Sequence, residues 1–341
     1  MTINASEKSA ISSGTEAGFT PSEEPTTELG VKTSRKSSRR STSSTGTPSN
    51  FLPVSFPNKF LPLLLILPEV LVVAVFFIWP SAQAIYQSTI QSNAFGLGSK
   101  FAGLANFKAA LASGYTRSLT ITAIFTLVTT VVSMAIGLLL AMQVEQTGRF
   151  RPIYRTLFIW SYAVPGAVAG TIWLFLFEPK VGPGAKLLQS MGIHWNFALS
   201  GSQAFTLICA MTIWQQCAYN YIFFSAGLQA IPANVIEAAG LDCKGWQKFK
   251  YIIFPLLSPT TLFVLILDVL SALFGSFSVI DIVSQGGPGG STTTLVYALY
   301  RDGFQNGDVG LAGAETLLLF VLSAILLLLQ SRITRRRVHY R

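Results

Sequence analysis

Long apolar runs separated by polar stretches fill the chain from about residue 60 onward. Six of these runs reach the roughly 20 residues that a helix needs to cross a bilayer. Prolines fall inside several of them, which bundled membrane helices tolerate because neighbouring groups satisfy the freed backbone. The pattern therefore predicts an all-α membrane protein whose six transmembrane helices cover residues 60–82, 119–143, 153–177, 203–225, 256–280 and 311–331.

The composition also indicates a membrane protein. Half of the 341 residues are hydrophobic, only 11% are charged, and the mean hydropathy is +0.51. A soluble domain carries about a quarter charged residues, so a core alone does not account for this much apolar surface. The net charge of +9 raises the possibility of nucleic-acid binding, which the positions of the charges argue against.

Lysine and arginine favour one side of the membrane. With a cytoplasmic N-terminus, 18 of the 24 basic residues fall on cytoplasmic segments, and the opposite orientation inverts that ratio. Because cytoplasmic segments carry the excess of basic residues, we expect both termini in the cytoplasm. The basic charge is then a signal of topology, and nucleic-acid binding loses its support. The six basic residues left outside are Lys100, Lys108, Arg117, Lys180, Lys186 and Arg301.

Residues 1–55 differ from the rest of the chain. They are rich in serine and threonine, acidic at first and then basic. Such a segment buries too little apolar surface to fold, so we expect a disordered cytoplasmic tail followed by a transmembrane domain over residues 56–341. A solvated tail is the simpler interpretation, and regulation by phosphorylation or contact of its basic half with lipid is the alternative.

The segment IEAAGLDCKGWQKFKYIIFP, residues 236–255, carries more pattern than a connecting loop needs. Alanines that favour helix precede Gly240 and Gly245, which we expect to bracket a break. Trp246, Phe249 and Ile253 then recur at the spacing of one helical face. The pattern predicts two short cytoplasmic helices that fit a groove on another protein, or else an amphipathic helix on the membrane surface.

The same segment resembles the EAA signature of permease subunits in binding-protein-dependent ABC importers. The resemblance implies a type I importer fold in a bacterial inner membrane, with a coupling loop at residues 232–255. It also implies a cytoplasmic ATPase homodimer that binds ATP and magnesium, a second and non-identical permease, and an extracytoplasmic substrate-binding protein. Cys243 stands where the family has glycine, and the interval to Trp246 is one residue short. The implied coupling residues are Glu237, Ala238, Ala239, Gly240, Asp242, Gly245 and Trp246.

Three further stretches, residues 76–107, 214–224 and 279–305, resemble the A-type glycerol-3-phosphate permeases within this family. The resemblance implies sn-glycerol-3-phosphate or a glycerophosphodiester as the substrate, with another sugar or polyol as the alternative. A stand-alone carrier or channel is a different possibility, but such carriers are typically built from inverted repeats, and none is visible.

Polar side chains within the apolar segments are candidates for the translocation path. Gln215, Gln216, Tyr219 and Asn220 form a stripe at helical spacing, and Asp268 lies deep in the fifth apolar segment. Amides and a phenol suit the recognition of hydroxyl groups. The alternative is that these side chains join helices through hydrogen bonds. We therefore predict that Gln216, Tyr219, Asn220 and Asp268 line the path or pack its walls.

The segment GGPGGSTTT lies on the outer side in this topology. It lacks the lysine of a phosphate-binding loop, so we interpret it as a flexible or re-entrant element at the outer mouth. Gly286, Gly287, Thr293 and Arg301 are the residues assigned to that mouth. Arg301 either steers an anion electrostatically or pairs with Asp302 or Asp308.

Catalytic chemistry is not indicated by any motif. The two histidines lie far apart in the sequence, and the cysteines have no metal-ligand spacing, so no metal site is predicted. We expect the chain to hold no cofactor and to act as a transport subunit. ATP hydrolysis is then the work of the partner ATPase.

Overall fold

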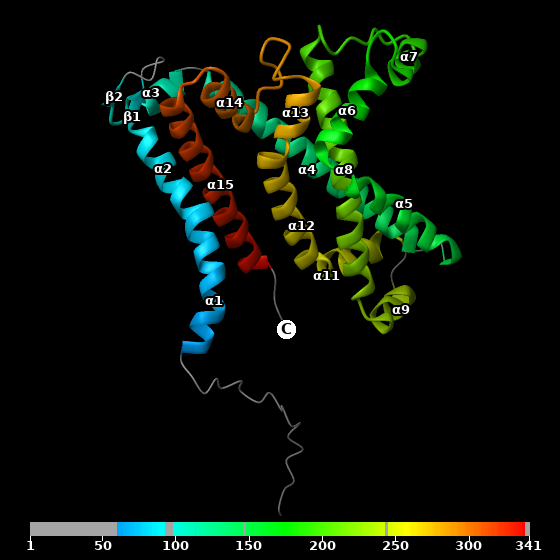
Figure 1. Cartoon of the computed structure of the whole chain (residues 1–341). Helices are drawn as coiled ribbons and strands as arrows, with labels where there is room; N and C mark the ends of the chain where they lie inside the picture. The colour runs from blue at the N-terminus through cyan, green and yellow to red at the C-terminus, as the bar shows by residue number, and fades with distance from the viewer. Residues whose placement is uncertain (1–59, 93–97, 113, 146–147, 243–244, 338–341) are drawn as a thin grey trace, which may run out of the picture. The chain divides into compact units, whose positions relative to one another are not determined.

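The structure is a computed structural model, and it describes residues 60–92, 98–112, 114–145, 148–242 and 245–337. The expected tail, residues 1–55, lies outside the described residues. Figure 1 shows that the described chain is built almost wholly of helices, with one short antiparallel pair of strands. The pair joins β1 (Ile90–Ser92) to β2 (Ser99–Phe101), with Gln91 opposite Lys100.

The first half of the described chain holds one long helix, α4, and several shorter ones. Helix α1 continues through the π-helical turn η1 into α2 without a bend, and the other helices follow in chain order. Their bounds are α1 (Phe60–Val73), η1 (Ala74–Ile78), α2 (Trp79–Ser88), α3 (Ala105–Ala112), α4 (Tyr115–Glu145), η2 (Gly148–Phe150), α5 (Arg151–Ala163), α6 (Gly166–Phe177) and α7 (Pro183–Ser190).

The second half contains two long helices, α8 and α15. The described chain has four π-helical turns, η1 in the first half and η3, η4 and η5 in the second. Such turns are rare and occur often at functional sites. The bounds are α8 (Gly201–Gln229), α9 (Ala233–Asp242), α10 (Trp246–Lys248), η3 (Phe249–Ile253), α11 (Phe254–Leu256), α12 (Ser258–Leu270), η4 (Ser271–Gly275), α13 (Phe277–Val283), α14 (Leu295–Tyr300), η5 (Arg301–Gln305) and α15 (Val309–Arg337).

Four helices of the described chain are long and apolar enough to cross a membrane alone. They span Leu63–Ser88, Tyr115–Glu145, Ser258–Gly275 and Val309–Arg332. Two bent pairs bring the number to as many as six: α5 with α6, bent by 98°, and α8 with α9, bent by 81°. The chain is therefore a mostly helical protein with four to six candidate spans.

The third expected span, residues 153–177, is not one helix. It divides into α5 and α6 at Val164 and Pro165. Proline disfavours helical backbone in the residue before it, and Val164 is accordingly extended, with φ −78° and ψ 120°. Proline also lacks the N–H that would continue the helix. The expectation of a single continuous helix here is wrong because of Pro165.

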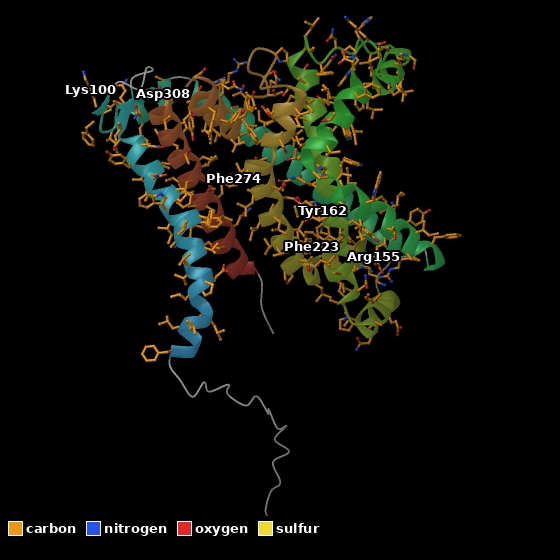
Figure 2. The ribbon with its side chains drawn as sticks, viewed as in Figure 1. Lys100, Arg155, Tyr162, Phe223, Phe274 and Asp308 are labelled. Carbon is orange, nitrogen blue, oxygen red and sulfur yellow. The ribbon has the colours of Figure 1, made fainter. Side chains whose placement is uncertain are left out.

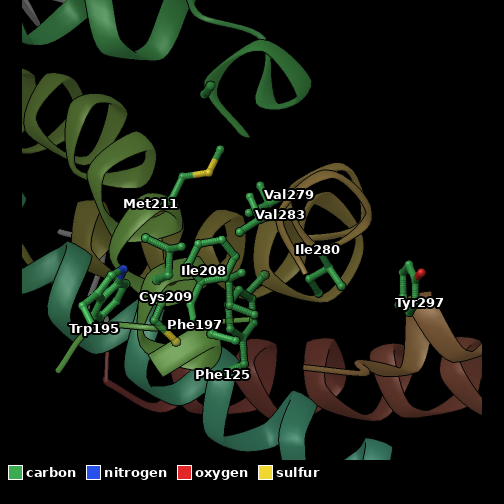
Figure 3. Close-up of a cluster of buried hydrophobic side chains, with 14 of the residues drawn as sticks. Phe125, Trp195, Phe197, Ile208, Cys209, Met211, Val279, Ile280, Val283 and Tyr297 are labelled. Atoms are coloured by element: carbon green, nitrogen blue, oxygen red, sulfur yellow. The ribbon is translucent and has the colours of Figure 1, made fainter. Parts of the chain in front are cut away.

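The long helices α4 and α8 pack closely along each other. At their crossing, a Cβ atom added to Gly137 would lie only 2.5 Å from the Cβ of Asn220. Small residues let membrane helices approach this closely, so Gly137 sets the separation of the pair. Towards one end of α8 a core of aromatic and aliphatic side chains gathers, including Phe125, Trp195 and Met211 (Figure 3).

Helices α2 and α15 lie side by side, as Figure 1 shows in cyan and red. A close approach at Gly313, whose added Cβ would lie 3.0 Å from the Ser88 backbone nitrogen, accompanies this contact. In contrast, none of the apolar window of the Leu63–Ser88 span is buried within the described chain. That apolar surface therefore faces lipid or another protein.

Candidate functional site

A buried carboxyl group joins three helices in the middle of the described chain. Asp268 of α12 accepts hydrogen bonds from Tyr219 Oη, from Asn220 Nδ2 at 2.9 Å and from Ser133 Oγ at 3.2 Å. The Asn220 amide also donates to Ser133 Oγ at 3.2 Å. Asp268, Asn220 and Ser133 are each fully buried. A buried carboxyl needs such partners, and here it has three.

A polar cavity of about 410 Å³ lies beside this network, at the break between α5 and α6. Irregular backbone at membrane depth occurs where it lines a cavity, which matches its position at Pro165. One wall comes from α8, and the turn η4 contributes Ser271 and Gly275. The lining residues are Tyr162, Val164, Pro165, Gly166, Thr212, Gln215, Gln216, Tyr219, Ser271, Gly275 and Val279.

Two glutamines of α8 face this cavity in different ways. The Gln215 amide nitrogen donates to the Val164 carbonyl oxygen at 3.1 Å, which satisfies a backbone group freed by the helix break. Gln216 is only 2% exposed, and neither its amide nitrogen nor its amide oxygen has a hydrogen-bond partner among the described residues. A buried amide that has no partner among the described residues thus lies in the wall of the cavity.

Aromatic rings shape the cavity's other side. Tyr162 of α5, labelled in Figure 2, meets the Tyr219 ring edge-on, with ring centroids 5.9 Å apart. Tyr162 is 60% exposed, whereas the Tyr219 phenol is turned towards Asp268. The phenol proton is therefore committed to the carboxyl group, and the oxygen of Tyr219 retains lone pairs that can accept a hydrogen bond.

The predicted path residues therefore separate into two groups. Gln216 and Tyr219 line the cavity, whereas Asn220 and Asp268 do not: they lie behind its wall and bond to Ser133. These contacts match the alternative considered from the sequence, in which the side chains join helices through hydrogen bonds. Sequence reasoning missed Ser133, Thr212 and Tyr162. Only the small and polar spacing along α4, from Thr129 through Ser133 to Gly137, hinted that α4 forms a helix interface.

The predicted coupling loop contains two helical pieces, as expected. Helix α9 runs from Ala233 to Asp242 and carries Glu237 exposed in its second turn. Gly240 lies inside α9, so the helix does not break at this glycine as expected. Gly245 has a φ of +49°, a backbone conformation that glycine adopts readily. Cys243 and the side chain of Asp242 lie outside the described residues.

The two alanines of the loop differ in their exposure. Ala238 is exposed, whereas Ala239 is only 6% exposed and packs against its own chain. We expected Ala239 to contact a partner protein, but within the described residues its surface is already covered. The exposed face of α9 is instead formed by Glu237, Ala238 and Gly240.

An apolar cavity of about 700 Å³ lies between this loop and the ends of α4 and α8. Trp246 stacks near Phe249, with ring centroids 5.2 Å apart, and both rings line the cavity with Ile253. This matches the predicted apolar face of the second short helix. Trp246 remains 72% exposed, so much of its ring is free to contact lipid or protein.

Glu145 ties together three helix ends beside that cavity. Its Oε1 accepts from Ser225 Oγ at 2.6 Å and from Gln229 Nε2 at 3.1 Å, both in the last turns of α8. Arg151, in the first turn of α5, places Nη2 at 2.9 Å from the same oxygen. The coupling loop therefore emerges from a helix end that is fixed to α4 and α5.

The predicted outer mouth is folded more firmly than we expected. Thr293 Oγ1 donates to the Gly286 carbonyl at 3.1 Å, and Thr292 Oγ1 donates to the Gly287 carbonyl at 2.9 Å. Gly286 has a φ of +76°, and an added Cβ would lie 2.8 Å from Thr293 Oγ1. These hydroxyl–carbonyl bonds close the turn on itself, and the expectation of a flexible or re-entrant element stays a prediction.

Arg301 lies in η5 and forms an ion pair with Asp302, its Nε at 3.2 Å from Oδ1. This is the pairing considered as the alternative to anion steering. The guanidinium side chain remains 40% exposed, and Asn306 Nδ2 donates to the same carboxylate oxygen at 2.9 Å. Nearby, burial raises the pKa of the Tyr297 phenol, which packs under Gly286.

Comparison with known proteins places these features in a family. Residues 133–339 match the family described as the binding-protein-dependent transport system inner membrane component. The chain is 46% identical over 289 residues to an sn-glycerol-3-phosphate transport system permease protein, UgpA, of Agrobacterium fabrum. That match covers 84% of this chain and 99% of the relative. A UgpA of Yersinia enterocolitica is 39% identical and is covered to 97%.

Solved structures agree on the fold. A bacterial ABC transporter involved in the import of the acidic polysaccharide alginate contains a chain that superposes with a TM-score of 0.71 at 18% identity. The superposition covers 82% of this chain and 96% of that chain. The family match and the extended similarity to transport permeases show a multi-pass protein of the inner membrane and not an enzyme. The chain belongs to the family of binding-protein-dependent transport system inner membrane components.

Proposed function

We propose that the chain is one of two unlike permease subunits of an ATP-driven importer for sn-glycerol-3-phosphate or a glycerophosphodiester. The observation that carries this proposal is the 46% identity to a glycerol-3-phosphate permease over nearly that protein's whole length. Another sugar or polyol remains the alternative substrate. The fold of the alginate importer chain, which is similar over 96% of its length, is consistent with the same class of machine.

In this proposal the chain crosses the membrane six times, and both termini lie in the cytoplasm. The two bent helix pairs then each count as a span, with α9 of the second pair outside the bilayer. The distribution of lysine and arginine supports this orientation. It places the α9 loop, Glu145 and Arg151 on the cytoplasmic side, and the Gly286 turn and Arg301 on the outer side.

The exposed face of α9, formed by Glu237, Ala238 and Gly240, is the proposed contact with a cytoplasmic ATPase homodimer. Exposure of this face and its direct connection to α8 support that role. The ATPase binds ATP and magnesium, and this chain holds neither. A second permease completes the pathway, and an extracytoplasmic binding protein delivers the substrate near the outer turn of Gly286, Gly287 and Thr293.

The cavity lined by Gln216 and Tyr219 is the proposed part of the translocation path in this subunit. Its polar groups are neutral, and no lysine or arginine lines it. Asn220 and Asp268 form its supporting wall. A cavity of a few hundred Å³ with few polar groups is typical of a small-molecule site.

The coupling role predicts the behaviour of a charge reversal at Glu237. The complex carrying Glu237→Lys is expected to insert and to pair with the second permease, but to lose at least about tenfold in uptake, because an interfacial charge pair is worth 1.4 kcal/mol or more. The measurement is uptake of labelled glycerol-3-phosphate by proteoliposomes, with ATP hydrolysis followed in parallel.

A matched control is Glu178→Lys, the same substitution at the end of α6 on the proposed outer side. This variant is expected to keep hydrolysis that responds to the loaded binding protein. Normal uptake and normal stimulated hydrolysis by the Glu237 variant would show that α9 is not the coupling element. Failure of the wild-type importer to carry glycerol-3-phosphate would instead refute the substrate.

A further inference from the structure

The break at Pro165 leaves the start of α6 without a cap on the wall of the cavity. No side chain caps this 12-residue helix, and its first helical hydrogen bond runs from Ala169 N to the Pro165 carbonyl at 2.9 Å. The N–H groups of the three residues before Ala169 therefore lack helical partners. Uncapped N–H groups in a membrane are costly, and a helix N-terminus carries a partial positive charge.

Gln216 provides an independent sign of a ligand at the same place. It lines the cavity together with Pro165 and Gly166, is 98% buried, and has no partner for either amide atom among the described residues. An unpaired buried polar group is costly, and a bound ligand or its water would recover that cost. Its NH₂ group offers two donors beside the helix N-terminus.

The opposite end of the cavity has the reverse polarity. Tyr219 lies three residues after Gln216, about 4.5 Å along α8, and its phenol already donates to Asp268. The Tyr219 oxygen is therefore left as an acceptor, and the carboxyl group of Asp268 lies directly behind it. This end favours hydroxyl donors and disfavours an anion, because a nearby acidic group repels like charge.

We propose that this cavity binds a small polyol phosphate in one orientation, with the phosphate at the α6 N-terminus and Gln216, and the hydroxyl groups at Tyr219. Anion binding at a helix N-terminus requires no lysine or arginine, which explains a phosphate site among neutral residues. The proposal rests on the proposed function and assigns each end of its substrate.

Two substitutions at Gln216 decide which end of the substrate it contacts. Gln216→Leu removes the donors, and maximal uptake of labelled glycerol-3-phosphate is expected to fall about tenfold, as for one lost hydrogen bond to a charged group. Gln216→Glu adds a negative charge beside the phosphate and is expected to transport at least about tenfold less than the leucine variant. If Gln216 instead accepted hydroxyl groups, the glutamate variant would transport better than the leucine variant.

The assay uses the complete importer in proteoliposomes with saturating loaded binding protein. Uptake is normalised to assembled complex. If the glutamate variant does not assemble, Gln216→Asn and Gln216→Asp replace the first pair. The aspartate variant is then expected to transport less than the asparagine variant.

The outcomes separate this inference from the proposed function. Wild-type uptake of glycerol-3-phosphate tests the proposed function alone. If wild type transports the phosphate ester, but the acidic variant equals or exceeds its neutral counterpart, the orientation is wrong while the function stands. Uptake by all the Gln216 variants within about twofold of wild type would also overturn the site, because a direct phosphate contact is worth more than that.

Discussion

At the scale of single residues, the Asp268 carboxyl group is the centre of a hydrogen-bond network in the described bundle. Three donors from α4 and α8 converge on it, and it is fully buried. Removing only the buried carboxyl from such a network costs more than replacing all of its members together. Each donor left without a partner keeps its own desolvation penalty. The network therefore supports the wall of the cavity and not its lumen.

Removal of this acceptor predicts a large loss of stability. Asp268→Ala leaves Tyr219, Asn220 and Ser133 without their shared partner, at about 1–3 kcal/mol for each donor that finds no other bond. The expected result is a clearly lower melting temperature of the detergent-purified complex. Asp281→Ala, at a half-buried aspartate of α13, is the control and is expected to cost little. Equal melting temperatures for the two variants would contradict the structural role of Asp268.

The sequence identified most residues of this region, but not which of them line the cavity and which support its wall. A polar stripe at helical spacing and a deep aspartate were visible in the sequence, since ionisable groups inside apolar segments are rare. Ser133 was not visible, because a serine in a membrane helix commonly bonds to its own helix, as Ser133 also does to Thr130 at 3.1 Å. The side of α8 that faces the cavity depends on the break at Pro165. The sequence pattern of α8 does not show where that break lies.

At the scale of helices, Glu145 fixes the ends of α4, α5 and α8 to one another. Its ion pair with Arg151 is partly solvated, with 35% of the arginine side chain exposed. Such pairs are worth about 0–1 kcal/mol. The hydrogen bond from Ser225, which is buried, is more protected, whereas Gln229 is exposed, so we expect the carboxylate to matter more than its charge partner through Ser225.

This difference predicts an order of effects among three variants. Glu145→Ala is expected to lower the melting temperature of the complex most, since the buried Ser225 hydroxyl loses its acceptor, at about 1–3 kcal/mol. Arg151→Gln is expected to have a small effect, and Arg155→Gln, one turn further along α5, to have none. A larger loss for Arg151→Gln than for Glu145→Ala would show that the ion pair dominates.

The apolar segments were predicted well as elements, whereas their breaks were not. Long apolar runs identify helices because length and hydropathy alone decide insertion. The bend of 98° at Pro165 was missed, because proline inside a membrane helix causes anything from a mild kink to a full break. Likewise, the direction in which Ala239 faces depends on how α9 folds back against α8, which its own sequence does not determine.

At the scale of the whole molecule, similarity to known permeases covers 84% of the chain, and residues 1–50 contribute little to it. Deletion of residues 2–50 is expected to leave uptake within about a factor of two, because such a composition does not pack against a folded domain. Uptake in cells and a detergent pull-down of the complex check this, with membrane insertion verified by immunoblot. Loss of assembly in the pull-down would assign the tail a structural role.

The network around Asp268 also has a consequence for the order of events during synthesis. Its donors lie on α4 and α8, and its acceptor lies on α12, 135 residues after Ser133. While the ribosome is still making α12, Tyr219 and Asn220 are already in the membrane without that acceptor. The α4–α8 pair therefore completes its hydrogen bonding only when α12 leaves the translocon. Nascent chains that stop before Asp268 expose unsatisfied polar groups in the membrane, which membrane quality control can recognise.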